Sequence, residues 1–369
     1  MVTAGVYLLG RMHFLFSLAP YAMMIVVVIA VLTALIAATI ALTQHDIKKV
    51  LAYSTVSQLG FMFMAAGAGA YWVAIFHLVT HAFFKACLFL GAGTVIHGCH
   101  HEQDMRHMGG LLKKMPITAA TYGFATLAIA GIAPFAGYYS KHGIMLALEQ
   151  NTNPYLGTLT AILVALATLT AFFTAFYMTR SFAMTFLGEY RGHAHPHESP
   201  PNMTIVLAVL ALLSIAGGYM LAGPWSLEHY LSHAIPVHGE HEHETLLASI
   251  LHSGWGIFGV LLGLVLYTKA KQVPGLVYQA LLPLGKLSSA KYYVDEIYGA
   301  LIVRPLEFLA KMLWKGIDQM LIDGVVNGTA EAIDMSAETV RYVQTGQTRH
   351  YAFFMMVGTI VVIFFYMVL

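Results

Sequence analysis

The sequence predicts an all-α integral membrane protein, and its composition and its apolar runs carry that prediction. Of the 369 residues, 58% are hydrophobic and only 10% are charged. Soluble domains average roughly 45–50% apolar and 25% charged residues, so an ordinary soluble enzyme is excluded. The net charge of +1 argues against nucleic acid as a partner, and the 2 cysteines are too few for a disulfide framework.

Eight stretches match the roughly 20 apolar residues that cross a bilayer core as a helix. They are 21–43, 50–69, 72–96, 117–148, 156–187, 203–223, 250–268 and 351–369. Residues 1–10 are also apolar, but they are too short to span and lack the features of a signal peptide. We expect residues 1–20 to be the end of a helix that begins upstream, followed by a loop, and residues 21–268 to form a bundle of seven spans.

The loops between these stretches alternate in charge. Lys and Arg gather in the loops 44–49, 97–116 and 188–202 and after residue 268, whereas the intervening loops 70–71, 149–155 and 224–249 contain none. Positively charged loops stay on the cytoplasmic side of a membrane. The alternation supports the number of spans, because one missed helix would scramble it, and it predicts that the histidine-rich loop 224–249 faces outward.

Residues 269–350 are expected to form a connector and a long surface helix before the last span at 351–369. Within 291–345, charged residues are interspersed with apolar residues at steps of four, the pattern of an amphipathic helix. Such a helix lies along a membrane surface and, if wholly helical, would extend roughly 80 Å. Bends are expected at Pro305, Gly316, Gly324 and Gly328.

The run 72–96 carries His77, His81 and Lys85 at steps of four. Each step turns a helix by about 400°, so the three side chains share one face and rise about 12 Å along the axis. Ionisable groups at membrane depth are costly and usually face a partner or a cavity. The spacing predicts a line along which protons hop. The plainer alternative is two core histidines bonded to backbone, beside a lysine that extends to the interface.

The run 117–148 would be about 48 Å long as one helix, too long for a single straight span. Pro134 and Gly137, with Gly131 before them, predict a break in its middle. Broken helices at membrane depth line aqueous cavities. Lys141 follows the break, so it either faces such a cavity or marks the helix end at the interface, and the spacing leaves both readings open.

Other polar residues give weaker signals. Lys48, between Asp46 and Lys49, is read more simply as an anchor at the start of a span, and Arg180 is expected to extend its side chain to the interface. Histidines cluster in three loops, but none of the clusters has the paired spacing of a closed zinc site, so no metal is expected. No phosphate-binding or dinucleotide fingerprint is present, so we expect no cofactor in this chain. The clustered residues are His97, Cys99, His100, His101 and His107, then His193, His195 and His197, and finally His238, His241 and His243.

Several longer motifs resemble the antiporter-like subunits of respiratory complex I (NADH:quinone oxidoreductase). They are DIKKVLAYSTVSQLGFMF (46–63), FHLVTHAFFKACLFLGAGTVIH (76–97), HEQDMRHMGGL (101–111) and GIAPFAGYYSK (131–141). The ending is similar to that of the L-type subunits, in KYYVDEIYGALIVRPL (291–306), IDGVVNG (322–328) and VQTGQTRHYAF (343–353). The resemblance covers essentially the whole chain. It implies an antiporter-like bundle with a broken helix, a long lateral helix and a C-terminal membrane anchor.

The resemblance also implies roles for single residues. Lys85 matches the central connecting lysine, with His77 and His81 beside it, and Lys141 matches the lysine of the second broken helix. Lys48 corresponds to a basic position of the family's central hydrophilic axis. The chain departs from the family in having His142 where an acidic residue usually follows the broken-helix lysine. Family members also begin well upstream of Met1, so we expect a C-terminal portion that lacks the entrance half of the channel.

The function implied by the resemblance is proton translocation coupled to electron transfer from NADH to quinone, as one membrane subunit of an enzyme whose redox centres lie on other subunits. Its expected partners are the lipid bilayer and the neighbouring membrane subunits, contacted by the lateral helix 291–345, and its expected location is the inner (plasma) membrane. Two alternatives remain open from the sequence. In the first, the chain is a component of a cation/proton antiporter. In the second, it is a structural fragment that pumps nothing.

Overall fold

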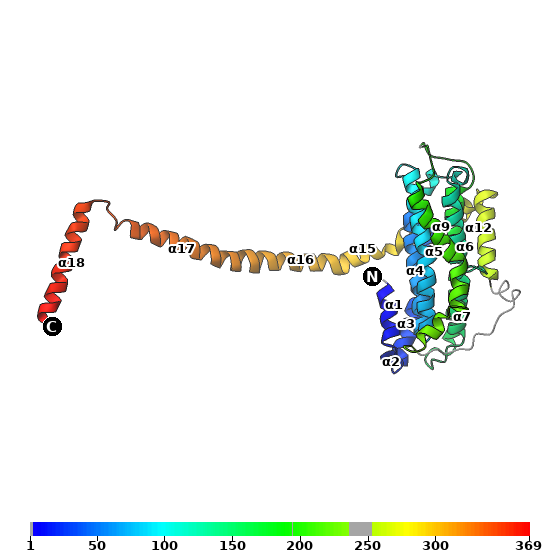
Figure 1. Cartoon of the computed structure of the whole chain (residues 1–369), viewed down its shortest axis with the longest axis horizontal. Helices are drawn as coiled ribbons and strands as arrows, with labels where there is room; N and C mark the ends of the chain where they lie inside the picture. The colour runs from blue at the N-terminus through cyan, green and yellow to red at the C-terminus, as the bar shows by residue number, and fades with distance from the viewer. Residues whose placement is uncertain (1–2, 194, 236–252) are drawn as a thin grey trace. The chain divides into compact units, whose positions relative to one another are not determined.

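The computed structural model describes residues 3–193, 195–235 and 253–369, and this part of the chain is helical, with no β-strand (Figure 1). The chain separates into two compact units, Met1–Tyr292 and Tyr293–Leu369. The first unit is a helix bundle that holds the candidate site, and the second contains the amphipathic segment and the last span. The all-α membrane fold is confirmed.

Among the described residues, five helices of the bundle are long and apolar enough to cross a membrane, and a sixth such helix lies in the second unit. The five are α3 (Pro20–Thr43), α4 (Ile47–Gly67), α5 (Tyr71–Gly98), α8 (Leu159–Phe186) and α9 (Pro201–Ala222). On α3, small residues such as Ala30 and Ala34 are buried, whereas Ile29 and Ile36 on its other side are exposed. A helix that is apolar on all sides suits a lipid environment.

The predicted break in the run 117–148 is confirmed. α6 (Pro116–Ala130) ends at Gly131, whose φ of +76° is a backbone conformation that favours glycine, and α7 (Ala136–Glu149) begins five residues further on. The peptide bond between Ala133 and Pro134 is cis. Gly137 lies against α6 so closely that an added Cβ would overlap the carbonyl oxygen of Ala128.

The predicted span 250–268 is present in its described part as α12 (Gly254–Thr268); residues 250–252 lie outside the described residues. Two buried glycines of α12, Gly259 and Gly263, pack against α8, and a third, Gly256, packs against the end of α6 at Ala130. A Cβ at Gly259 would lie 2.9 Å from both the Cβ of Ala175 and the carbonyl oxygen of Phe172. After α12 the chain turns by 105° into α13 (Val273–Ala280), and α14 (Leu282–Ser289) follows. The other short helices of this unit are α1 (Thr3–Arg11), α2 (His13–Phe16), α10 (Leu227–Leu231), η1 (Met105–His107), η2 (Leu111–Lys113) and η3 (Lys291–Tyr293).

The loops predicted to share the positive side meet at one end of the bundle. The backbones of Asp46 and Asp104 pair in an isolated antiparallel β-bridge. The backbone amide of Gly109 donates to the carbonyl oxygen of Thr185 over 3.1 Å. Asn153, in a loop predicted for the opposite side, instead donates to the carbonyl oxygen of Pro20. The grouping of the loops agrees with the alternation of charge along the sequence.

In the second unit the helical backbone runs without interruption from Val294 to Arg341. At 1.5 Å per residue this segment is about 70 Å long. It consists of α15 (Val294–Tyr298), η4 (Gly299–Val303), α16 (Arg304–Leu313), η5 (Trp314–Asp323) and α17 (Gly324–Arg341). Near two of the four positions where bends are predicted, the helix has wide π-type turns, which precede Pro305 and surround Gly316. The final helix, α18 (Thr348–Val368), is the predicted last span.

Candidate functional site

The predicted row of ionisable side chains lies on α5, inside the bundle. His77, His81 and Lys85 are 0%, 6% and 5% exposed, so all three lie on the buried side of the helix, as steps of four predict. The ring centroids of His77 and His81 are 6.1 Å apart. The side chain of Lys85 remains within the protein, which removes the reading in which it extends to the interface.

His77 is bonded to side chains of two neighbouring helices rather than to backbone. Its Nδ1 lies 2.9 Å from Ser140 Oγ on α7, and its Nε2 lies 3.3 Å from Gln58 Oε1 on α4. The hydroxyl of Thr80 donates to the same Ser140 Oγ over 2.8 Å. These bonds join α4, α5 and the second half of the broken helix at one buried point.

Lys85 and His81 have fewer partners. Among the described residues neither Lys85 Nζ nor His81 Nε2 has a hydrogen-bond partner, although both atoms are buried. Lys85 Nζ lies 5.6 Å from the ring centroid of Phe89, and the ring of Phe84 packs edge-on against His81 at 5.4 Å. A buried ammonium with so few contacts is expensive to maintain in its charged form, which is typical of a group whose protonation changes during function.

Lys141 lies one turn into α7 and is 6% exposed. Its Nζ donates to the carbonyl oxygen of Ile129 over 2.7 Å and lies 5.2 Å from the ring centroid of Phe61. Ile129 belongs to the last turn of α6, where backbone carbonyls lack partners within the helix and carry the negative end of its dipole. The structure therefore places Lys141 inside the bundle at the break, not at the interface.

The structure does not bring Lys48 together with this buried group. Lys48 is exposed in the first turn of α4, and the side chain of Asp46 caps that helix by accepting from the backbone amides of Lys48 and Lys49. Its role on a central axis stays a prediction. His142, the position that departs from the family pattern, stacks on Tyr138 with ring centroids 5.7 Å apart.

The sequence reading missed three polar residues of the site. Ser140, Thr80 and Gln58 are all 0% exposed and all bond within the His77 network. A signal for each was present, because each is a polar residue inside an apolar run and two of them directly precede Lys141 and His81. Their meeting depends on how α4, α5 and α7 pack, which no local pattern states.

Comparisons with known proteins agree with this architecture. A family profile described as "NADH:quinone oxidoreductase/Mrp antiporter, TM" matches residues 1–174. NADH-quinone oxidoreductase subunit L of Rhodobacter capsulatus is 38% identical over 99% of this chain and 61% of its own length. The subunit of the same name from Mycobacterium tuberculosis (strain CDC 1551 / Oshkosh) is 40% identical over 98% of this chain and 57% of its own length. The chain is therefore similar in sequence to the antiporter-like subunits of this family.

The fold of the family is also seen in a solved structure. A chain of the Mrp complex from Dietzia sp. DQ12-45-1b superposes with a TM-score of 0.63 and 23% identity, over 98% of this chain and 36% of that chain. At this identity the likeness speaks for the fold alone. The chain spans about three fifths of the length of the curated relatives it matches. With this similarity and several apolar helices, it is a multi-pass inner-membrane protein.

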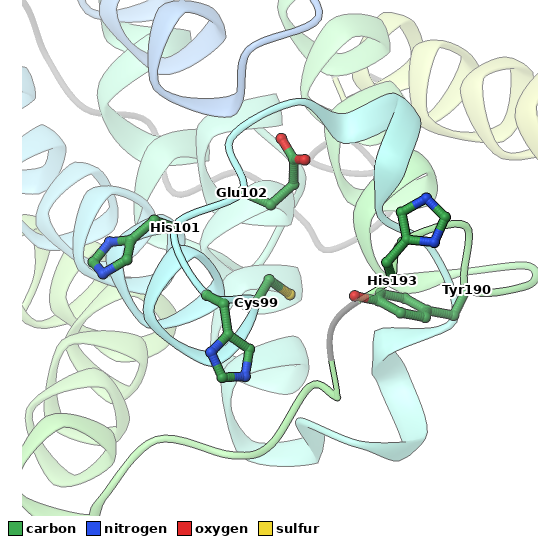
Figure 2. A pocket seen from close by; sticks show the side chains of 7 residues that line it. Cys99, His101, Glu102, Tyr190 and His193 are labelled. Carbon is green, nitrogen blue, oxygen red and sulfur yellow. The ribbon is translucent and has the colours of Figure 1, made fainter.

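A second polar region of this antiporter-like chain lies where the loop after α5 meets the loop after α8. Cys99, His100, His101, Glu102, Tyr190, Gly192 and His193 line a cavity of about 300 Å³ there. Figure 2 shows the rings of His101 and His193 on opposite sides of it, with Cys99 between them in this view. Backbone N–H groups, first that of Asp104, lower the pKa of the Glu102 carboxyl. Within the described residues no three His, Cys, Asp or Glu side chains are placed to hold a metal ion, and His238, His241 and His243 lie outside those residues.

Arg180 corrects one expectation from the sequence. Its side chain is 2% exposed and does not extend to the interface. It bends inward, where it donates to the carbonyl oxygen of Gln44 over 2.6 Å and lies 3.1 Å from His45 Nδ1. Partial burial, followed by the charge of Arg180, lowers the pKa of His45. The loop between α3 and α4 supplies a carbonyl group beside the end of α8, which a single-helix pattern cannot predict.

Proposed function

We propose that this chain serves as an L-type membrane subunit of an NADH:quinone oxidoreductase and takes part in moving protons across the membrane while other subunits transfer electrons from NADH to quinone. The names of its curated relatives support the first half of the proposal. The buried row on α5, joined to the broken helix by the His77 network, supports the second half and is the observation that carries it.

In this proposal each buried group has a chemical task. His77 and His81 carry imidazole rings that can both accept and give a proton, and Lys85 holds or releases one proton at the end of their row. Lys141 exchanges its proton at the break in the helix, where the Ile129 carbonyl group stabilises its charged form. Because like charges in a low-dielectric interior repel strongly, charging one lysine favours release of the proton from another.

The second unit suits contact with other membrane subunits. From Val294 to Arg341 its helix presents charged residues among apolar ones, and a surface helix of about 70 Å is long enough to cross several neighbouring bundles. We propose that these neighbours are the other antiporter-like subunits of the same complex. In this scheme the redox centres belong to other chains, and this chain carries no cofactor. The loops rich in Lys and Arg face the cytoplasm.

One alternative has an observation in its favour. The family profile includes Mrp antiporters, and the fold of an Mrp complex chain covers nearly all of this one. A component of a cation/proton antiporter would use the same buried lysines without electron transfer. A third reading, a structural fragment that pumps nothing, needs the buried ionisable row to have no role.

Purification from native membranes separates these readings. A tagged form of the chain, expressed at its own locus and extracted in mild detergent, is expected to carry with it NADH:quinone reductase activity that is sensitive to quinone-site inhibitors. A tagged chain that elutes with antiporter subunits, and without that activity, contradicts the proposal. The matched control is an unrelated multi-pass protein carrying the same tag, which reports activity that co-elutes non-specifically.

A further inference from the structure

The hydrogen bonds around His77, with the Gln58 amide oriented as it is, favour one of the two neutral tautomers of its ring. The Thr80 hydroxyl lies 2.8 Å from Ser140 Oγ and 3.2 Å from the carbonyl oxygen of His77. When it donates to the nearer acceptor, Ser140 Oγ, the hydroxyl hydrogen of Ser140 is directed toward His77 Nδ1 at 2.9 Å. A nitrogen that accepts a hydrogen bond is unprotonated in the neutral ring. The proton of neutral His77 is then on Nε2, where it faces Gln58 Oε1, an acceptor, at 3.3 Å.

The opposite tautomer fits this arrangement poorly. With the proton on Nδ1, the unprotonated Nε2 would face the acceptor oxygen of Gln58, and two acceptors repel. Turning the Gln58 amide would restore a bond, since its Nε2 group is buried and has no partner among the described residues. Two complete arrangements of the ring therefore exist, and the Gln58 amide and the Ser140 hydroxyl determine which one is adopted.

We infer that Ser140, Thr80 and Gln58 are positioning residues that hold His77 as the neutral Nε2–H tautomer and connect it to the broken helix. The inference rests on the proposed proton path and deepens it. A proton that arrives at Nδ1 through the Ser140 hydroxyl creates a doubly protonated ring, and release of the Nε2 proton returns the ring to neutrality. The neutral ring then carries its proton on Nδ1, the arrangement that the reversed Gln58 amide and Ser140 hydroxyl accommodate, so one proton has entered at Nδ1 and one has left from Nε2 with no net change on the ring.

Ser140 connects the histidine row of α5 to the half-helix that carries Lys141. Ser140 directly precedes Lys141 on α7, the half-helix that begins after the break. Among the bonds of the described residues, those of Ser140 are the ones that tie the imidazole row of α5 to α7 through side chains. A movement of α7 at the break therefore shifts Ser140 and, with it, the hydrogen bonds of His77. A change at His77 acts on α7 through the same bonds.

Proton pumping in inverted membrane vesicles tests the inference. Ser140→Ala is expected to lower the NADH-driven pumping rate at least about tenfold, the low end of what a positioned proton-transfer group contributes. The matched control is Ser214→Ala, because Ser214 is equally buried but bonds only to the backbone carbonyl of Leu210 in its own helix. That variant should pump as the unchanged chain does.

A second pair of variants separates positioning from packing. Thr80→Val keeps the shape of the side chain but removes the hydroxyl, whereas Thr80→Ser keeps the hydroxyl and removes a methyl group. We expect reduced pumping in the first and near-normal pumping in the second, with Gln58→Met resembling the first. The amount of tagged chain that sediments with NADH:ferricyanide reductase activity measures assembly in each case.

The outcomes are distinct. If Lys85→Met blocks pumping while Thr80→Val pumps as well as Thr80→Ser, the inference is wrong and the proton path stands. If Lys85→Met itself pumps normally, the path is wrong and the roles of Ser140, Thr80 and Gln58 fall with it. Loss of pumping in Thr80→Ser as severe as in Thr80→Val also contradicts the inference, because it would indicate packing rather than the hydroxyl.

Discussion

The buried cations of the bundle differ in how their charges are satisfied, and the difference follows from their neighbours. Lys141 and Arg180 donate to backbone carbonyl groups near helix ends, whereas Lys85 Nζ has no hydrogen-bond partner among the described residues and lies 5.6 Å from the ring centroid of Phe89. The spacing in the sequence predicted that Lys85 shares a face with the histidines. It could not predict the partners of Lys141 and Arg180, because Ile129 and Gln44 come from segments that only the packing of helices brings close.

Arg180 is predicted to stabilise the loop between α3 and α4. Arg180→Leu leaves the Gln44 carbonyl group without its 2.6 Å bond, and an unsatisfied buried acceptor costs about 1–3 kcal/mol. The expected results are a lower midpoint of thermal unfolding in detergent and faster proteolytic cleavage of the loop between α3 and α4, which contains His45. Arg106→Leu is the control, since the Arg106–Asp104 pair is largely exposed and such pairs contribute about 0–1 kcal/mol. Equal effects of the two variants would contradict this account.

At the scale of helices, the sequence predicted the spans and the break well, since both depend on local properties. The length of an apolar run sets the length of a membrane helix. Pro134 and Gly131 interrupt the helix of the run 117–148 whatever its neighbours are, because their effect on the backbone is local. The sequence was less informative about contacts between helices. In the sequence, Gly259 and Gly263 are simply small residues in a span, and the structure shows that they let α12 approach the backbone of α8.

This close approach gives a prediction for α12. Gly259→Ala adds a Cβ only 2.9 Å from Ala175 and from the Phe172 carbonyl oxygen, so the helices must move apart. Overpacking of this kind costs about 1–3 kcal/mol, which exceeds the roughly 1 kcal/mol that alanine gains over glycine in helix propensity. Gly254→Ala, where an added Cβ meets nothing within 4 Å, is the control. We expect a lower yield of folded chain in membranes for Gly259→Ala alone, and the idea fails if both variants accumulate equally.

At the scale of the whole chain, two units have different kinds of stability. The bundle, Met1–Tyr292, packs its own core, whereas the helix from Val294 to Arg341 is a single rod followed by one span. An isolated helix gains most of its stability from packing of an apolar face, so this rod is suited to lie on other proteins or on lipid. Charge and periodicity predicted the rod. They could not identify its neighbours, because a partner surface leaves no pattern in this sequence beyond the apolar face.

The central claim is that the buried row of α5 conducts protons, and Lys85 tests it most directly. Lys85→Met removes a buried ammonium that has no hydrogen-bond partner among the described residues, so the variant should fold and assemble at least as well as the unchanged chain. Lys85→Arg keeps the charge but cannot readily release a proton. Lys286→Ala, which removes an exposed lysine of α14, is the control.

The measurement is the initial rate of NADH-driven acidification of inverted vesicles, divided by the amount of assembled complex. We predict a loss of at least about tenfold for both Lys85→Met and Lys85→Arg, as expected when a proton-transfer group is removed, and no change for Lys286→Ala. Full acidification in Lys85→Met, at normal assembly, would contradict the account.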